Sequence, residues 1–345
     1  MLSLTDKAKH ITERKNYLDI LKVIATFGVI FLHVFARCIK GPLNTYNWYV
    51  SVVGDSLVRW SVPIFVMISG ALFLNPIKDL STNIVINKYV KRLLMAYVFW
   101  YFFYCSFNFV RSYFSSSSLV IDYNLLEPEF HLWFLPMLMG VYLLIPILRK
   151  VASDIKLLIY ALTIWSIYLT VSFILILDIS QISNLFTMNI VVGYAGYFLL
   201  GYFLSLDLLL KQQRFALYFF SVIGALITIF GSVSSSLSQG FINTKYLYYI
   251  SPQVLVMAAA LFVFVKRQSS KIENSIKGFI EYVRKDLFGI YLVHIFWLNL
   301  IDNGIIRNMF NYAISFVVIA LLVFIFSLYT TKLLRKIPFV SQFVE

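Results

Sequence analysis

Long hydrophobic runs separated by short polar connections dominate the chain. A helix needs about 20 mostly apolar residues to cross the ~30 Å hydrocarbon core of a bilayer. Ten runs reach or approach that length: Tyr17–Ala36, Val50–Leu74, Leu93–Val110, His131–Leu148, Leu157–Leu177, Ile190–Leu210, Phe215–Val233, Tyr246–Val265, Leu287–Ile301 and Asn311–Thr330. Such long, continuous runs favour helices over barrel strands, because lipid-exposed backbone must pair internally. The pattern predicts an all-α, polytopic membrane bundle of ten transmembrane helices.

Lysine and arginine are unevenly distributed among the connections. With a cytoplasmic N-terminus, the inner segments carry 22 basic residues and the outer segments carry 5. Because cytoplasmic loops are enriched in these residues, we expect both termini to be cytoplasmic. We expect one integral-membrane domain over 1–345, with cytoplasmic tails at 1–16 and 331–345. The longest inner connection, Lys266–Asp286, places apolar residues at helical spacing between basic ones, which predicts an amphipathic interfacial helix.

Composition agrees with a membrane protein. The chain is 60% hydrophobic and 13% charged, whereas a soluble domain is nearer ~25% charged. A net charge of +13 would suggest a nucleic-acid partner in a soluble protein, but here the positive-inside bias accounts for it. The two cysteines, Cys38 and Cys105, are too far apart in sequence to form a disulfide framework. We expect membrane lipid as a partner, and neither nucleic acid nor a bound metal.

The first span carries an unusual set of polar residues. Lys22 and His33 are eleven positions apart, which puts them on one helix face, roughly 16 Å apart along the axis. Asp19 and Arg37 extend the same stripe at helical spacing. Charges inside a bilayer are costly and often mark a catalytic site or a pathway. The alternatives are an interhelical hydrogen bond for His33 and an interfacial ion pair for Asp19 and Lys22, with Lys22 snorkelling.

The second span has two features that predict a bend and close packing. Pro63 interrupts the hydrogen-bond ladder, and Ser69-Gly70 permits close contact with another helix. One interpretation is an ordinary kinked helix. The functional one is that the kink opens a cavity into which Arg59 points.

Further candidates lie on the inner side and in later spans. Lys88, Lys91 and Arg92 precede the third span, where they follow the positive-inside bias or bind the phosphates of a cytoplasmic ligand. His131 opens the fourth predicted span. His294 lies in the middle of the ninth, within Tyr291-Leu-Val-His294.

At these residues the chain resembles the membrane-bound acyltransferase 3 family. That family has an acid, a basic residue three positions later, and a histidine eleven positions after that, as in Asp19, Lys22 and His33, with Arg usual where this chain has Lys22. Lys88, Lys91 and Arg92 lie where the family has an Arg-x-x-Arg-type cluster. The runs Val62–Gly70, Leu132–Pro146 and Tyr291–His294 also look like family segments. The resemblance covers nearly the whole chain.

The resemblance implies a transferase that moves an acyl group, normally acetyl, from cytoplasmic acyl-CoA to a hydroxyl of a cell-surface polysaccharide or lipid-linked glycan. It implies His33 as the central catalytic residue, with Asp19 and Lys22 beside it. Lys88, Lys91, Arg92 and Arg59 would bind acetyl-CoA, a donor substrate rather than a permanently bound cofactor. His131, Tyr291 and His294 are accessory candidates. The location implied is the bacterial cytoplasmic membrane.

His33 can act in two ways that the sequence leaves open. An imidazole can take the proton of the attacking hydroxyl, or it can carry the acyl group as an acyl-imidazole. Larger relatives carry a soluble transferase domain, whereas this chain ends soon after the tenth span, as stand-alone polysaccharide O-acetyltransferases do. The alternative functions are a multi-pass transporter or glycan exporter, which intramembrane charges also suit, and a membrane domain that binds a small molecule for sensing or uptake.

Overall fold

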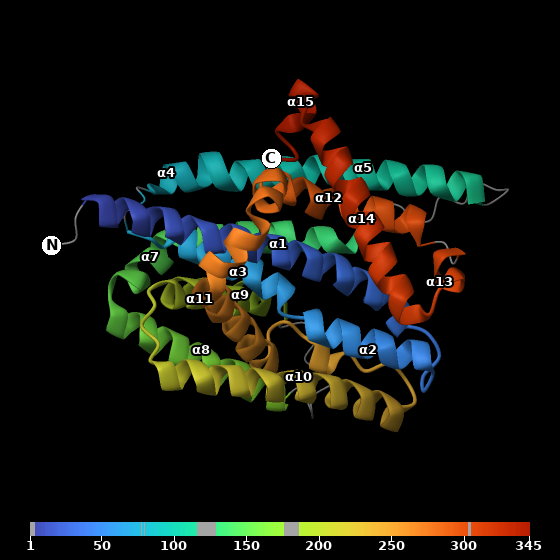
Figure 1. The fold of residues 1–345 in the computed structure, drawn as a ribbon, viewed down its shortest axis with the longest axis horizontal. Helices are drawn as coiled ribbons and strands as arrows, with labels where there is room; N and C mark the ends of the chain where they lie inside the picture. The colour runs from blue at the N-terminus through green and yellow to red at the C-terminus, as the bar shows by residue number, and fades with distance from the viewer. Residues whose placement is uncertain (1–3, 77, 79, 116–128, 176–185, 303–304) are drawn as a thin grey trace.

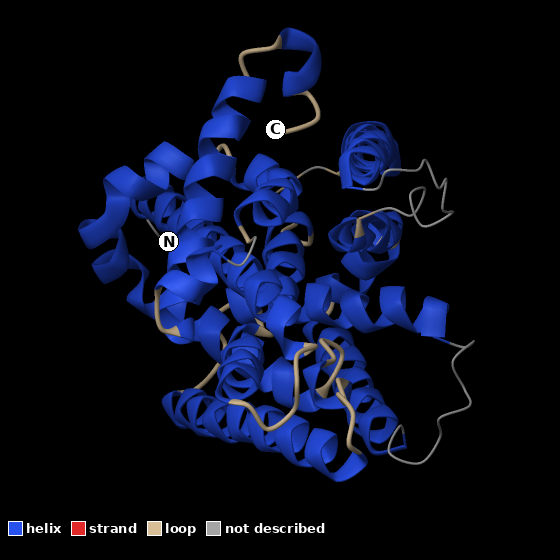
Figure 2. Ribbon diagram, turned by 90° about the vertical axis from the view of Figure 1, so that its right-hand side faces the viewer, coloured by secondary structure: helices blue, strands red, loops and turns tan. Residues whose placement is uncertain are grey.

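The computed structural model describes residues 4–76, 78, 80–115, 129–175, 186–302 and 305–345. All regular elements in these ranges are helices (Figure 2). They are α1 (Leu4–Ile39), α2 (Tyr46–Val58), α3 (Ser61–Phe73), α4 (Thr82–Ile84), η1 (Val85–Val90), α5 (Lys91–Ser115), η3 (Phe130–Trp133), α6 (Phe134–Leu143), α7 (Ile145–Ser153), α8 (Ile155–Leu175), α9 (Phe186–Ser205), α10 (Lys211–Gln239), η5 (Lys245–Leu247), α11 (Pro252–Val283), α12 (Leu287–Ile301), α13 (Ile305–Met309), α14 (Tyr312–Leu334) and α15 (Pro338–Ser341). The helices α1, α5, α8 and α10 run along a common direction (Figure 1).

Several of these helices have the length and composition of membrane spans. Among the described residues seven qualify: Asn16–Ile39, Tyr46–Phe73, Thr82–Tyr113, Ile155–Ile174, Lys211–Gln239, Lys245–Val283 and Tyr312–Leu334. The pair Phe130–Leu143 and Ile145–Ser153 is bent by 56° and gives an eighth if it is one broken span. Two shorter apolar helices, Val191–Ser205 and Leu287–Ile301, coincide with the other predicted runs. The chain is therefore an all-helical, multi-pass membrane protein, while the count of ten and the cytoplasmic termini stay predictions.

The second span is broken where the sequence predicts a bend. Helix α2 ends at Val58 and α3 begins at Ser61. A proline ring clashes with the carbonyl group four residues earlier, which for Pro63 is that of Arg59. Pro63 therefore fits within the first turn of α3, and the chain changes direction just before it.

Helix α1 is the centre of the bundle, and it packs against α2, α3, α11, α12 and α14. Helices α3 and α9 approach each other most closely at two glycines. A Cβ atom on Gly70 would lie 1.8 Å from the carbonyl oxygen of Phe198, and one on Gly201 would lie 2.0 Å from that of Met67. The close contact predicted at Gly70 is confirmed. It holds α3 firmly beside the functional residues of α1.

The helix predicted over Lys266–Asp286 is present as far as Val283, but it is continuous with the preceding span. Helix α11 includes both, with a kink at the non-helical residue Ile276. Beyond the kink, Ile280 and Val283 are buried in the protein core, whereas Phe279 is exposed. Arg284, directly after α11, is thereby held beside Asp19 on α1.

The segment after α14 folds back onto the bundle. The Trp100 indole donates to the carbonyl oxygen of Phe343 at 3.1 Å, and the rings of Phe99 and Phe343 stack at 4.5 Å. Arg335 Nη1 lies 2.8 Å from Asp286 Oδ1. The predicted tail 331–345 thus begins inside α14 and ends packed against α5, and the predicted tail 1–16 is helical from Leu4 onward.

Candidate functional site

Three histidines lie together in the middle of the bundle. His33 comes from α1, His131 from η3 and His294 from α12, and all three are buried. The ring centroids of His33 and His294 are 5.1 Å apart, and those of His131 and His294 are 5.2 Å apart. A cavity of about 20 Å³, which we call the histidine chamber, is lined by Val29, His33, Val62, Phe65, His131, Trp133, Phe134, Tyr249 and Tyr291.

Helix α12 fixes two of these rings through its backbone. His294 Nδ1 faces the carbonyl oxygen of Tyr291, and His131 Nε2 lies 3.4 Å from that of Leu292. Because a carbonyl only accepts hydrogen bonds, each of these nitrogens carries the proton in a neutral ring. The Tyr291 hydroxyl donates to the backbone carbonyl of His131. His33 Nδ1, His131 Nδ1 and His294 Nε2 are buried without a hydrogen-bond partner among the described residues.

A larger cavity of about 410 Å³ adjoins the histidine chamber, and we call it the donor cavity for the role proposed for it below. Its lining residues are Lys22, Phe65, Ile68, Ser69, Leu72, Phe73, Tyr89, Arg92, Leu93, Phe134, Leu138, Tyr142, Arg284, Lys285, Leu287, Phe288, Tyr291 and Glu345. Phe65, Phe134 and Tyr291 line both cavities. The Phe134 ring lies 6.2 Å from Phe65 and 5.6 Å from Tyr291, measured between centroids.

Four basic residues surround the donor cavity at the Lys22 end of α1. Lys22 Nζ binds Asp19 Oδ1 at 2.9 Å, and Arg284 Nη1 lies 4.0 Å from Asp19 Oδ2. Arg92 and Lys285 are exposed, so the cavity is open to the surface on this side. Arg284 and Lys285 were not among the site residues predicted from the sequence. The only feature that pointed to them is that they lie in the inner connection with the most basic residues.

The residues predicted to bind acetyl-CoA are divided by the structure. Arg92 lines the donor cavity, whereas Lys88 and Lys91 are exposed and are not among its lining residues. Arg59 pairs with the fully buried Asp55, and its guanidinium lies 5.2 Å from the ring centroid of Tyr249, which lines the histidine chamber. Arg59 is therefore near His33 rather than near the basic residues of the donor cavity.

Asp19 and Lys22 likewise lie at the opposite end of the stripe from His33. They flank the donor cavity and pair with each other, while His33 lies in the histidine chamber. Between the described residues no group of three or more His, Cys, Asp or Glu side chains is placed to hold a metal ion.

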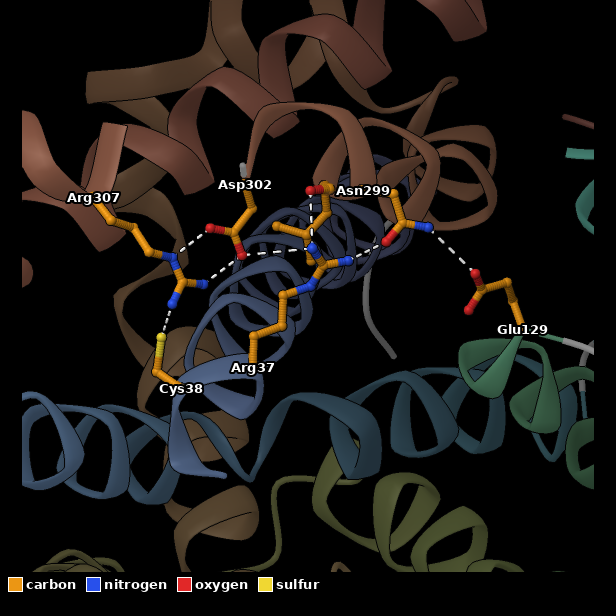
Figure 3. A network of polar contacts seen from close by, with 7 residues as sticks. Arg37, Cys38, Glu129, Asn299, Asp302 and Arg307 are labelled. Carbon is orange, nitrogen blue, oxygen red and sulfur yellow. Dashed lines mark hydrogen bonds and ion pairs between the residues drawn. The ribbon is translucent and has the colours of Figure 1, made fainter. Parts of the chain in front are cut away.

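A polar network lies beyond His33, at the end of α1 (Figure 3). Arg37 donates to the side chain of Asn299, and its Nη1 lies 3.1 Å from the carbonyl oxygen of Leu298 and 3.5 Å from Asp302 Oδ2. Arg307 binds the same Asp302 carboxylate and also contacts Cys38. These bonds fasten the end of α1 to α12 and α13.

A family model described as an acyltransferase domain, that of acyltransferase 3, matches residues 15–332. The chain belongs to the acyltransferase 3 family, and it is a membrane acyltransferase. No curated protein and no solved structure matches it.

Proposed function

We propose that the protein transfers an acetyl group from cytoplasmic acetyl-CoA to a hydroxyl of a cell-surface polysaccharide or lipid-linked glycan, in the bacterial cytoplasmic membrane. The observation that carries the proposal is that two cavities share part of their walls. A wide cavity with basic residues in its lining has Phe65, Phe134 and Tyr291 in common with the small chamber lined by the central histidine.

The donor cavity suits the two halves of acetyl-CoA. Arg92, Arg284 and Lys285 at its exposed side supply cations for the phosphates. The apolar rings and side chains deeper in the cavity suit the slender pantetheine arm, which would carry the thioester toward Phe65, Phe134 and Tyr291. Ground-state binding would thus place the thioester next to His33.

His33 would act on the acceptor hydroxyl. Its unpartnered Nδ1 or the other ring nitrogen takes the hydroxyl proton while the oxygen attacks the thioester carbonyl carbon. A C–O bond forms, the C–S bond breaks, and the proton passes from the imidazolium to the departing thiolate. In the acyl-histidine route the ring nitrogen attacks first and the hydroxyl displaces it in a second step.

The test is direct transfer by purified protein. Surface polysaccharide from the source cells, freed of esters by mild alkali, serves as acceptor, and acetyl-CoA labelled in the acetyl group serves as donor. We expect label in the polysaccharide, released again by alkali. Absence of label, together with flux of polysaccharide fragments across liposomes containing the protein, would support a transporter instead.

The basic residues of the donor cavity give a prediction for donor binding. Replacing Arg92 and Arg284 together with alanine removes two charged contacts to phosphate, each worth roughly 1.5–3 kcal/mol. We expect the KM for acetyl-CoA to rise at least about 100-fold, with a weaker dependence on salt. Steady-state kinetics at two ionic strengths measures both effects. Lys150→Ala, which removes an exposed charge outside the cavity lining, is the control. An unchanged KM in the double variant would rule out this entrance.

The size of the histidine chamber gives a prediction for the acyl group. About 20 Å³ is little more than the ~10–15 Å³ needed by one water, so the chamber favours the smallest acyl groups. Val62→Ala removes two methyl-sized groups from its wall. We expect the ratio of butyryl to acetyl transfer to rise roughly 10-fold, because one methylene in an apolar pocket changes discrimination by about that factor. Val34→Ala, a buried valine on α1 outside the chamber lining, should leave the ratio unchanged.

A further inference from the structure

The ring of Phe130 contacts His33. Phe130 is the first residue of η3, and its ring meets the His33 ring edge-on at 4.9 Å between centroids. Although it touches a buried histidine, Phe130 is 53% exposed. One part of the ring therefore contacts the imidazole, while another part is not covered by the described residues.

A chain of hydrogen-bonded polar side chains begins at Glu129 (Figure 3). Glu129, the residue before Phe130, has its Oε1 3.3 Å from Asn299 Nδ2, and the Asn299 side-chain oxygen accepts from Arg37. Arg37 lies one helical turn after His33 on α1. Carboxylate, amide and guanidinium thus form a connected chain that begins at the residue before Phe130 and ends one helical turn after His33.

The two ends of this network differ in burial. Asp302, with 2% of its side chain exposed, is saturated by Arg37 and Arg307, and this part explains how α1 is fastened to its neighbours. Arg37 itself is 29% exposed, and Glu129 is half-buried. The fastening role does not require an exposed aromatic ring, nor a second carboxylate at the edge of the network.

We propose that Phe130, Glu129, Asn299 and Arg37 form the subsite for the acceptor sugar. The apolar C–H face of a pyranose would pack on the exposed Phe130 ring, while its hydroxyls would bond to the carboxylate, the amide and the guanidinium. A ring held in this way brings one hydroxyl to His33 from the side opposite the thioester. The inference rests on the proposed function and names which residues select its acceptor.

The proposed acceptor subsite is separate from both cavities. Phe130 is absent from the lining of both the donor cavity and the histidine chamber. Its replacement should consequently alter the affinity for the acceptor and leave the affinity for acetyl-CoA as it is. An effect on folding alone would not change the KM for the acceptor and leave the KM for acetyl-CoA as it is.

The test uses the full-length protein, labelled acetyl-CoA and de-esterified surface polysaccharide. We expect Phe130→Ala to raise the KM for polysaccharide at least about 10-fold, in line with the contribution of an aromatic contact plus its buried area. The KM for acetyl-CoA should stay within about two-fold, since donor contacts are separate. Phe130→Trp should restore the KM for polysaccharide, whereas Phe130→Leu, which fills space without an aromatic face, should not.

Phe241→Ala is the matched control, because it removes another exposed phenylalanine, 62% exposed, that lies in neither cavity lining. An unchanged polysaccharide KM in Phe130→Ala would overturn the subsite, and so would full recovery in Phe130→Leu. In both cases the wild-type protein would still transfer acetyl, and the proposed function would stand. If the wild-type protein transfers no acetyl to polysaccharide, the proposed function fails and the subsite falls with it.

Discussion

Replacing His33 with alanine is expected to lower the rate of acetyl transfer by about 10²–10⁴-fold, the usual contribution of a general base, or more if an acyl-histidine forms. His33 is the one histidine of the cluster that lies on the central helix, and its Nδ1 is unpartnered in the described part of the chain. The small imidazole cavity left behind should be tolerated by a bundle that α1 anchors through five other helices. Initial rates with labelled acetyl-CoA measure the loss.

The folded state of this variant has to be checked separately. Size-exclusion elution and thermal unfolding in detergent should match the wild-type protein, and the KM for acetyl-CoA should change little, because His33 does not line the donor cavity. A His33→Ala protein that is folded and transfers acetyl at the normal rate would refute the mechanism. Acid quenching of wild-type protein with labelled donor, and no acceptor, distinguishes the routes: protein-bound label lost in His33→Ala indicates the acyl-histidine.

Part of the site could be predicted because one helix carries it. Helical periodicity alone aligned Lys22 with His33, and in the structure each lines one of two cavities that share three lining residues. Periodicity could not show that Lys22 and Arg284 both pair with the Asp19 carboxylate, because the second contact depends on where α11 ends. Lys88 and Lys91 lie close to Arg92 in sequence, and the sequence gave no sign that they are outside the cavity lining.

The partners of His33 illustrate the other limit. His131 and His294 were candidates as lone histidines in apolar runs, yet their convergence depends on how η3 and α12 pack on α1. Phe130 and Asn299 gave no signal, since aromatic and amide residues are common at span ends. Which residues cluster is decided by tertiary packing, whereas the helices themselves follow from hydrophobic length.

Packing between α3 and α9 is expected to be the most sensitive feature of the fold. Gly201→Val would push α9 away from α3, because even its Cβ would lie 2.0 Å from the backbone oxygen of Met67. A backbone cannot move aside as a flexible side chain can. Overpacking usually costs about 1–3 kcal/mol and at times more, and we expect the upper end of that range here.

The consequence should reach the site, because α3 also carries Phe65 and Val62 of the histidine chamber. Thermal unfolding in detergent should show Gly201→Val melting well below the wild-type protein, with activity lost in parallel. Gly278→Ala is the matched control: nothing lies within 4 Å of its added Cβ, and replacing a helical glycine with alanine gains roughly 0.5–1 kcal/mol. If Gly201→Val melts as the wild-type protein does, α3 and α9 do not pack through these glycines, and the wall of the chamber is held by other contacts.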